Sequence, residues 1–378
     1  MENPKIRFKG FTKDWEQRKL GDEAEEILAG GDIDKEKAVD DGVYPIYANA
    51  LTNDGIVGYY DDYYRVKAPA VTVTGRGEVG RARARMIDFT PVVRLLAVRS
   101  NHDCYFLENA INNHKVVVES TGVPQLTVPQ LSSYDICFPK DIVEEKKIGT
   151  YFNQLDRLIT LHQRKCEQTK KLKKYMLQKM FPQNGAKVPE IRFDGFTYDW
   201  EQRKFSELYA RSSEKNDGSI GMDKNITVAT MQFKNDVKVS TTEYLKTYYT
   251  FKLGDIAFEG HQSKEFRYGR FVENDIGNGI VSHIFAVFRP IQEYDLYFWK
   301  YAINNETLMQ RILARSTKAS TMMHDLVTND FLNETFLVPS VKEQKQIGAF
   351  LNKLDNLITL HQRQTDFYKK YNFYFISS

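Results

Sequence analysis

The chain has 378 residues, of which 42% are hydrophobic and 27% charged, an ordinary composition for two or three soluble globular domains. No run of about 18 apolar residues is present, so we predict no membrane span. The opening MENPKIRFKG lacks an apolar signal core, so we expect a cytoplasmic protein. The net charge of +3 excludes an acidic DNA mimic. Three cysteines without CxxC spacing argue against a disulfide framework and a structural zinc site.

The first recognisable element is a segment that occurs twice. Ile6–Lys19 reads IRFKGFTKDWEQRK and Ile191–Lys204 reads IRFDGFTYDWEQRK, with only two differences. A second pair follows in the same order, because Glu144–Arg164 and Glu343–Arg363 are identical at 14 of 21 positions, including LITLHQR in both. Two ordered matches indicate a tandem duplication, so we predict two copies of one fold whose middle parts have diverged.

The first middle part contains short runs rich in Val, Ile, Tyr and Phe, broken by Gly, Asn and Asp: GVYPIYANA, AVTVTGRG, RLLAVRS and YDICFP. The pattern predicts strands, with a short helix over 103–115, and therefore a mixed α+β domain of about 140 residues. Tyr47 and Asn49 follow the first strand and are candidate DNA contacts. The small-polar loops 120–127 and 316–323 occupy matching places in the two halves and are weaker candidates.

A glycine-rich segment, GRGEVG at Gly75–Gly80, formally fits the GxGxxG pattern of dinucleotide-binding loops. Such a loop must open a helix, whereas RARARMID follows here, with arginines alternating at strand spacing. We therefore predict a hairpin and no nucleotide site. Arginine can grip guanine edges or phosphates, so the hairpin is a candidate DNA reader; the alternative is a charged hairpin that simply faces water. Its candidate residues are Arg76, Arg81, Arg83 and Arg85.

The next element, from about Asp141 to Phe181, contains no proline before its closing FPQNG and has apolar residues at alternating steps of four and three. This is a heptad seam on a helix of about 60 Å, and a second copy of the seam occurs near the chain's end, so we predict that the two helices pack together. Leu158/Leu161 and Leu357/Leu360 are expected to widen the apolar face. The seam residues are Ile148, Phe152, Leu155, Ile159 and His162, matched by Ile347, Leu351, Leu354, Ile358 and His361.

The first helix is strongly basic in its second half, where seven Lys and Arg residues between 164 and 179 accompany one acid, Glu167. Either this is a solvated polar face or it is a stripe facing phosphates or a partner. The second helix ends differently, in KKYNFYFISS, and lacks several of these basic positions.

The second middle part again predicts strands, in KNITVATMQF, LGDIAFEG and HIFAVFRP, with helix over 294–314. In place of the arginine hairpin it has EGHQSKEFRYGRF, whose polar side chains differ. Candidate DNA contacts here are Gln232, Lys234, His261, Gln262, Ser263, Lys264, Arg267 and Arg270.

Catalytic signatures are absent from the sequence: there is no (N/D)PP(Y/F), GxxxxGK(S/T), HExxH or GxSxG motif, so we assign no catalytic residue and no metal ligand. ExK occurs in both copies, as Glu144–Lys146 and Glu343–Lys345. A nuclease would also need a metal-binding aspartate on a nearby strand. A glutamate at the start of a helix is favoured by the helix dipole, and we prefer that structural interpretation.

The order of globular domain, helix ending in LDRLITLHQR, second globular domain and closely similar helix resembles the specificity (S) subunit of type I restriction–modification enzymes. The resemblance covers essentially the whole chain. It implies an α+β fold with two mixed target recognition domains, 1–140 and 188–340. It also implies a central conserved helix within 141–187 and a distal one within 341–378, antiparallel in a coiled coil with pseudo-two-fold symmetry.

The resemblance also implies a function: non-catalytic recognition of a bipartite, asymmetric DNA site, one domain per half-site, with the helices setting the spacing. Expected partners are double-stranded DNA, two methyltransferase subunits and two restriction/translocase subunits. S-adenosylmethionine, ATP and Mg²⁺ would be bound by those partners and no cofactor by this chain. Two alternatives stay open, a stand-alone endonuclease and a coiled-coil scaffold without a DNA role.

Overall fold

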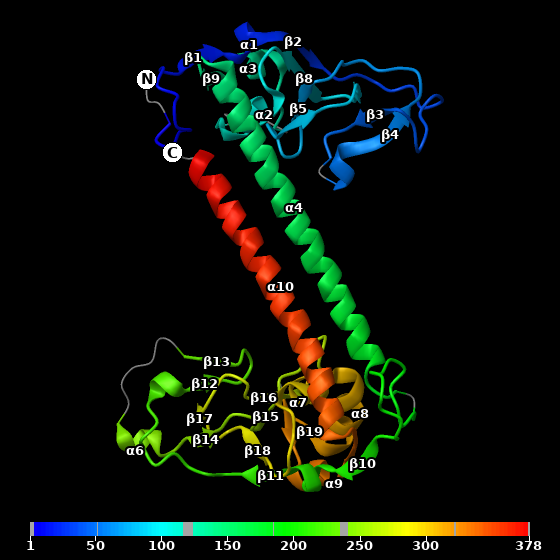
Figure 1. Ribbon diagram of the computed structural model, residues 1–378, viewed down its shortest axis with the longest axis vertical. Coiled ribbons are helices and arrows are strands. Elements are labelled where there is room, and N and C mark those ends of the chain that lie inside the picture. Colours follow the sequence, from blue (N-terminus) through cyan, green and yellow to red (C-terminus); the bar gives the residue numbers. More distant parts are fainter. Residues whose placement is uncertain are drawn as a thin grey trace. The chain divides into compact units, whose positions relative to one another are not determined.

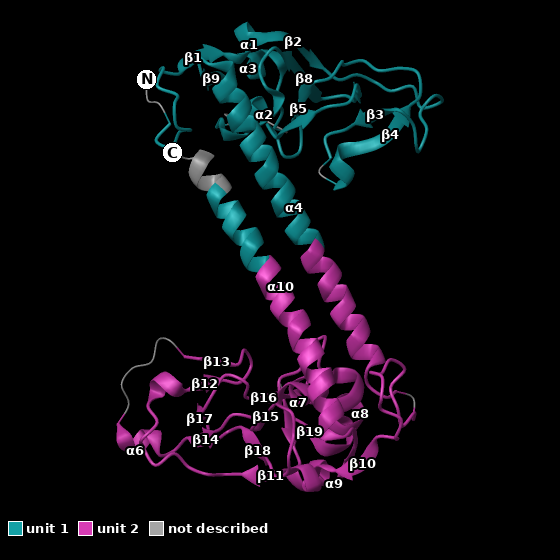
Figure 2. Cartoon of the chain, viewed as in Figure 1, with its two compact units in different colours: residues 1–164, 362–378 teal, residues 165–361 magenta. Residues whose placement is uncertain are grey.

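The structure is a computed structural model, which describes residues 4–50, 52–115, 124–183, 185–234, 241–320 and 323–376, with side chains of the last helix described as far as Tyr371. The chain forms two compact units (Figure 2). The first unit comprises residues 1–164 and 362–378, and the second comprises 165–361. Each of the two long helices is therefore shared between the units. Parts of the loops 120–127 and 316–323, namely 120–123 and 321–322, lie outside the described residues.

The first unit is built on a four-stranded antiparallel sheet in the order β2-β8-β5-β6, with a smaller sheet β4-β3-β7 beside it (Figure 1). Helix α2 packs on β5 and β6, and its apolar side chains join those of the sheet in the main core. The elements in chain order are β1 (Glu16–Lys19), α1 (Leu20–Glu23), β2 (Ala24–Ala29), β3 (Tyr44–Tyr47), a 3-10 helix (Thr52–Gly55), β4 (Ile56–Tyr60), β5 (Ala70–Thr74), β6 (Ala82–Arg85), β7 (Thr90–Pro91), β8 (Leu95–Ser100), α2 (Cys104–Asn113), α3 (Val128–Ser132), β9 (Asp135–Phe138) and α4 (Ile142–Lys179).

The second unit repeats this plan with the sheet β11-β18-β15-β16, whose strands correspond one by one to those of the first unit. The predicted helix over 294–314 is two helices, because the Asn305 side chain caps the backbone N–H of Thr307 at 3.1 Å and starts a new one. The elements are β10 (Glu201–Lys204), α5 (Phe205–Leu208), β11 (Tyr209–Ser212), a 3-10 helix (Met222–Lys224), β12 (Ile226–Thr227), β13 (Gln232–Phe233), α6 (Thr242–Leu245), β14 (Tyr249–Phe251), β15 (Ile256–Glu259), β16 (Arg270–Glu273), β17 (Gly279–Val281), β18 (Ala286–Pro290), α7 (Leu296–Ile303), α8 (Glu306–Ser316), β19 (Thr317–Ala319), β20 (His324–Leu326), α9 (Thr328–Asn333), β21 (Thr335–Val338) and α10 (Val341–Ile376).

The repeated EQRK segments form the same strand in both units. In the first unit β1 pairs with β9, with Glu16 opposite Phe138, and in the second β10 pairs with β21, with Glu201 opposite Val338. Because β9 and β21 lead directly into the long helices, each short ladder joins the start of a domain to the start of its helix. The repeated segments therefore form one structural frame in each unit, and the divergent middle part is inserted into it.

The two glutamates of the ExK triplets are buried partners of arginines in the repeated leading segments. Arg7 donates from Nε and Nη2 to the Glu144 carboxylate at 2.5 and 2.8 Å, and Arg192 does the same to Glu343 at 2.7 and 2.9 Å. Two-point arginine–carboxylate contacts of this kind are geometrically specific. The prediction that the triplet opens the helix is confirmed.

A glycine in the first turns of each long helix allows a close approach to a shorter helix. A Cβ atom at Gly149 would lie 2.0 Å from Oδ1 of Asp103, and one at Gly348 would lie 2.2 Å from Oδ1 of Asp295. Those aspartates cap α2 and α7 by accepting from the N–H groups of Phe106 and Phe298. The repeated Ile-Gly pair is thus explained by packing.

The long helices lie against each other in antiparallel fashion within each unit. In the second unit Lys173 Nζ lies 2.6 and 2.8 Å from the Asp355 carboxylate oxygens, and Cys166 Sγ lies 4.0 Å from the Ile358 carbonyl oxygen. In the first unit the His162 and Tyr368 rings stack, with centroids 5.7 Å apart. Residue numbers rise along one helix as they fall along the other.

The predicted seam divides into two stretches with different neighbours. Ile347, Leu351 and Leu354 belong to the core of the second domain, and Ile148 packs on the core of the first. Ile159 is half-buried, and Phe152 and Leu155 are buried. The opening turns of each helix are therefore domain core, and the pairing contacts come from later turns.

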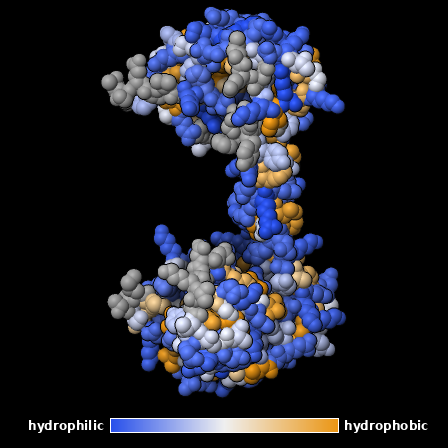
Figure 3. Space-filling model, turned by 90° about the vertical axis from the view of Figure 1, so that its left-hand side faces the viewer, coloured by the Kyte–Doolittle hydropathy of each residue, from blue (hydrophilic) through white to orange (hydrophobic). Residues whose placement is uncertain are grey.

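The leucines of LITLHQR do not widen a buried face as expected. Leu158, Leu161 and Leu360 remain 36%, 44% and 48% exposed, and Figure 3 shows hydrophobic residues at the surface of the helical part among hydrophilic ones. The reason is that a pair of helices has only one shared side, and these residues lie off it. None of the helices, over the residues described, is long and apolar enough to cross a bilayer.

Candidate nucleic-acid interface

The predicted arginine hairpin is present in the first unit. Strands β5 and β6 pair antiparallel, with Thr72 opposite Arg83, and β6 is the edge strand of the sheet. The connecting turn needs glycine at Gly77 and Gly80, whose φ angles are +78° and +83°. Strand β6, and not a helix, follows the GxGxxG segment, so the predicted hairpin is confirmed.

Two of the four arginines project from the hairpin without internal partners. Arg76 and Arg81 are exposed, and among the described residues neither side chain makes a hydrogen bond or ion pair. Arg83 is 59% exposed and lies 3.0 Å from an Asp54 carboxylate oxygen. In water such a pair is worth at most about 1 kcal/mol, so Arg83 could exchange Asp54 for a phosphate or a base edge at little cost.

Arg85 belongs to the fold instead. Its side chain is 8% exposed, it donates to Asp54 Oδ2 at 2.6 Å and to Thr72 Oγ1 at 3.1 Å, and its guanidinium lies 3.7 Å from the centre of the Tyr47 ring. Tyr47 is itself buried. These contacts attach the lobe made by β3, β4 and the 3-10 helix to the main sheet.

Asn49 also has a structural role. It accepts from the N–H of Gly75 at 2.9 Å and donates to the Val93 carbonyl at 3.2 Å, which fixes the start of the hairpin turn. The sequence analysis missed Asp54, which holds Arg83 and Arg85. The signal available was its place in the polar stretch TNDG between two strands.

A half-buried carboxyl lies behind the hairpin. Burial raises the pKa of Glu108 on α2 to about 7, against the opposing effects of the Ala84 backbone hydrogen bond and of Arg83. The group therefore titrates near neutral pH, and above that pH it offsets part of the hairpin's positive charge.

The corresponding hairpin of the second unit is β15–β16, whose longer loop, 260–269, is internally braced. Ser263 Oγ accepts from the N–H groups of Glu265 and Phe266, and Arg270 pairs with Glu259 at 2.8 Å while lying over the Phe266 ring. At the base, Gln262 Nε2 lies 2.5 Å from His324 Nε2. Ser263, Arg270 and Gln262 are thus supports of the loop.

The remaining candidates of the second unit face outward. Lys264 and Arg267 are exposed on the braced loop, and the backbone of Arg267 is held by Glu306 at 3.2 Å. His261 is exposed at the loop's first turn, and Gln232 and Lys234 are exposed on and after β13. A rigid loop with free polar tips loses little entropy when it contacts a ligand.

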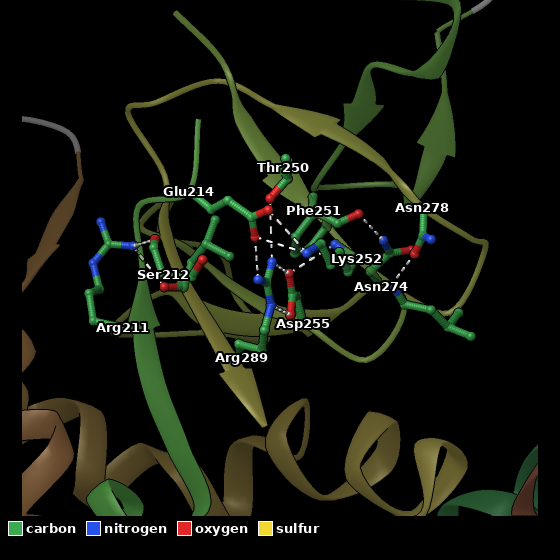
Figure 4. A network of polar contacts seen from close by, with 12 residues as sticks. Arg211, Ser212, Glu214, Thr250, Phe251, Lys252, Asp255, Asn274, Asn278 and Arg289 are labelled. Atoms are coloured by element: carbon green, nitrogen blue, oxygen red, sulfur yellow. Dashed lines mark hydrogen bonds and ion pairs between the residues drawn. The ribbon is translucent and has the colours of Figure 1, made fainter. Parts of the chain in front are cut away.

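A polar network that the sequence analysis did not predict holds the lobe formed by the strand pairs β12–β13 and β14–β17 in place (Figure 4). Arg289 on β18 donates to both oxygens of the buried Asp255 at 2.9 Å each and also pairs with Glu214. The Arg289 and Lys252 contacts lower the pKa of Glu214 to about 2. Because Lys252 and Asp255 follow β14, the network ties that lobe to the four-stranded sheet. Across the residues that are described, no group of three or more His, Cys, Asp or Glu side chains could hold a metal ion.

Two matched domains, each with a hairpin that exposes cationic side chains, present the kind of surface that a two-domain DNA-recognition protein uses. Residues 12–171 and 198–366 match the family described as type I restriction modification DNA specificity domain, and the chain belongs to that family. It is 29% identical over 161 residues and 33% identical over 129 residues to two proteins of Mycoplasma pneumoniae that are named as type I specificity subunits. These matches cover 41% and 32% of this chain but span only 47% and 34% of those relatives.

The whole fold has a solved counterpart. The crystal structure of the type I restriction–modification S subunit from M. genitalium superimposes with a TM-score of 0.66 over 99% of this chain and 98% of that one, at 14% identity. At that identity the likeness concerns the fold: two mixed α and β domains with long helices.

Proposed function

We propose that this chain is the DNA sequence-recognition subunit of a type I restriction–modification complex, in which each globular domain reads one half of a bipartite, asymmetric site. The observation that carries the proposal is that equivalent hairpins, β5–β6 and β15–β16, expose different polar side chains from the same framework. Arginine and lysine there suit guanine edges and phosphate oxygens. A shared frame with unlike tips is what two readers of different half-sites require.

The proposed interface consists of the outward-facing candidates, with the braced and buried ones acting as supports. Tyr47, Asn49, Arg85, Gln262, Ser263 and Arg270 hold the loops. The side chains that would meet DNA are Arg76, Arg81 and Arg83 in the first domain, and Gln232, Lys234, His261, Lys264 and Arg267 in the second.

The two exposed LITLHQR segments support a further part of the proposal, the docking of two methyltransferase subunits. Two identical partners need two equivalent surfaces, and a duplicated chain supplies them. Two restriction/translocase subunits would complete the complex. S-adenosylmethionine, ATP and Mg²⁺ belong to those partners, and this chain contributes recognition without a catalytic group or cofactor. As a subunit that acts on DNA with these partners, it would work in the cytoplasm.

The decisive experiment is to express the chain with its methyltransferase partner in a host that lacks adenine N6 methylation and to map methylated adenines in the genome. We expect one bipartite motif with a fixed gap of unread base pairs. An assembled complex that yields no methylation motif and no site-specific DNA binding would favour the alternative of a coiled-coil scaffold without a DNA role. Mg²⁺-dependent cleavage by the purified chain alone would establish the endonuclease instead.

A further inference from the structure

The basic half of α4 and the braced loop of the second domain line one hollow. Its volume is about 650 Å³, and both elements contribute to its wall within the second unit. From α4 come Lys170, Lys173, Lys174, Leu177 and Gln178, and from the loop come Glu265 and Phe266. The candidate recognition loop is thus adjacent to the basic stripe.

The lysines of this hollow fall into two groups. Lys173 is bound to Asp355 at 2.6 Å and Lys300 to Asp275 at 2.5 Å, so their charges are matched inside the domain. Lys174 is exposed and has no ion-pair partner among the residues described. Lys170 pairs with Glu167, which is itself 63% exposed, and also interacts with Cys166; an exposed ion pair in water is weak.

Neutral donors complete the wall. The amides of Gln178 and Asn304 line the same hollow as Lys170 and Lys174. Lysine, glutamine and asparagine are residues that commonly contact DNA phosphates. Leu177, Phe266, Tyr301 and Ile358 form the apolar part of the same wall. Three acids also line the hollow: Glu265 is exposed, Asp355 is already held by Lys173, and burial raises the pKa of Glu306.

We propose that Lys170 and Lys174 of α4 bind backbone phosphates of the duplex whose bases the 260–269 loop reads, at the edge of the second half-site. This rests on the proposed function and adds to it a phosphate-binding surface on the spacer helix. The two lysines lie on one side of α4, since residues four apart are neighbours on a helix.

The surface belongs to one half of the molecule only. In register with LITLHQR, Lys170 of the first copy corresponds to Lys369, but Lys174 corresponds to Phe373 and Lys173 to Asn372. The chain therefore treats its half-sites unequally. The second half-site gains phosphate contacts from the helix, and the first depends more on its own hairpin.

The test is binding of the assembled complex to its mapped site at several salt concentrations. Each lost phosphate contact reduces the magnitude of the negative slope of log K against log salt by about 0.9, so Lys170→Gln with Lys174→Gln should reduce that magnitude by about 1.8. The ratio of cognate to non-cognate affinity should stay unchanged, because phosphates carry no sequence. Ethylation interference maps the phosphates that the complex contacts. In the double variant, the signals that disappear should come only from phosphates beside the second half-site.

The matched control is Lys165→Gln, compared with Lys174→Gln alone. Lys165 is exposed on the same helix but does not line the hollow. Equal slopes for these two single variants would overturn the proposal, and so would loss of methyltransferase subunits from the double variant, which would make the surface a protein interface. Failure of the unaltered complex to bind any bipartite site would instead refute the proposed function.

Discussion

Individual arginines of one hairpin have different roles although they alternate regularly in the sequence. Arg83 and Arg85 lie on β6 and Arg81 directly precedes it, yet Arg81 faces solvent, Arg83 is paired at the surface and Arg85 is buried against Tyr47. The difference arises from their neighbours: Asp54 pairs with Arg83 and Arg85, and Thr72 and Tyr47 also contact Arg85. Substitutions along one strand should therefore separate recognition from stability.

Arg81→Ala should weaken recognition of the first half-site and leave the free energy of unfolding nearly unchanged, because its side chain is solvated in the free protein. Arg85→Ala should destabilise the first domain by about 2–3 kcal/mol, the cost typical of losing charge-assisted hydrogen bonds. Methylation mapping and denaturant unfolding measure the two effects. Equal losses at both half-sites from Arg81→Ala would make it a general phosphate contact.

A second residue-scale prediction concerns Glu273, which is 3% exposed and whose carboxylate oxygens have no hydrogen-bond partner among the described residues. Burial raises its pKa well above the ordinary value. The folded state therefore keeps a proton that the unfolded chain has lost. Stability should fall by up to about 1.4 kcal/mol per pH unit as the pH rises above about 4.3, until the folded pKa is reached.

Glu273→Gln removes this titration, so it should flatten that part of the profile and stabilise the protein at neutral pH. The free energy of unfolding measured between pH 5 and pH 8 checks this. A variant whose pH profile has the same slope as the original chain would show that Glu273 is ionised in the folded state.

Among the elements, the long helices are fixed to their domains by a glycine and an ion pair. Gly149→Ala places a methyl group 2.0 Å from Oδ1 of Asp103. Helix propensity alone would favour alanine by about 1 kcal/mol, but overpacking costs about 1–3 kcal/mol, so we expect net destabilisation. Thermal unfolding measures the sign of the change in stability for Gly149→Ala. Thr150→Ala, at an exposed neighbouring position, is the control. A Gly149→Ala protein that is more stable than the original chain would show that α4 and α2 can move apart at no cost in free energy.

At the scale of the whole molecule, the matched ladders β1–β9 and β10–β21 make the middles exchangeable. A chain in which residues 20–134 are replaced by a second copy of 205–334 should keep its frame, because both blocks begin and end at the same register positions. We expect its methylation motif to consist of the second half-site twice. A motif that retained the first half-site would mean that the specificity lies outside the exchanged block.

The sequence by itself determined the duplication, the long helices, the hairpin in place of a nucleotide loop, and the family. These follow from periodicity and internal identity, which are local properties of the chain. Only the tertiary structure decided which polar residues are free. Asp54 binds Arg85, Glu259 binds Arg270, and His324 contacts Gln262, in pairs whose members are 31, 11 and 62 residues apart in the sequence. Whether a charged side chain is available to DNA depends on which groups the fold brings beside it, and residue spacing does not encode that.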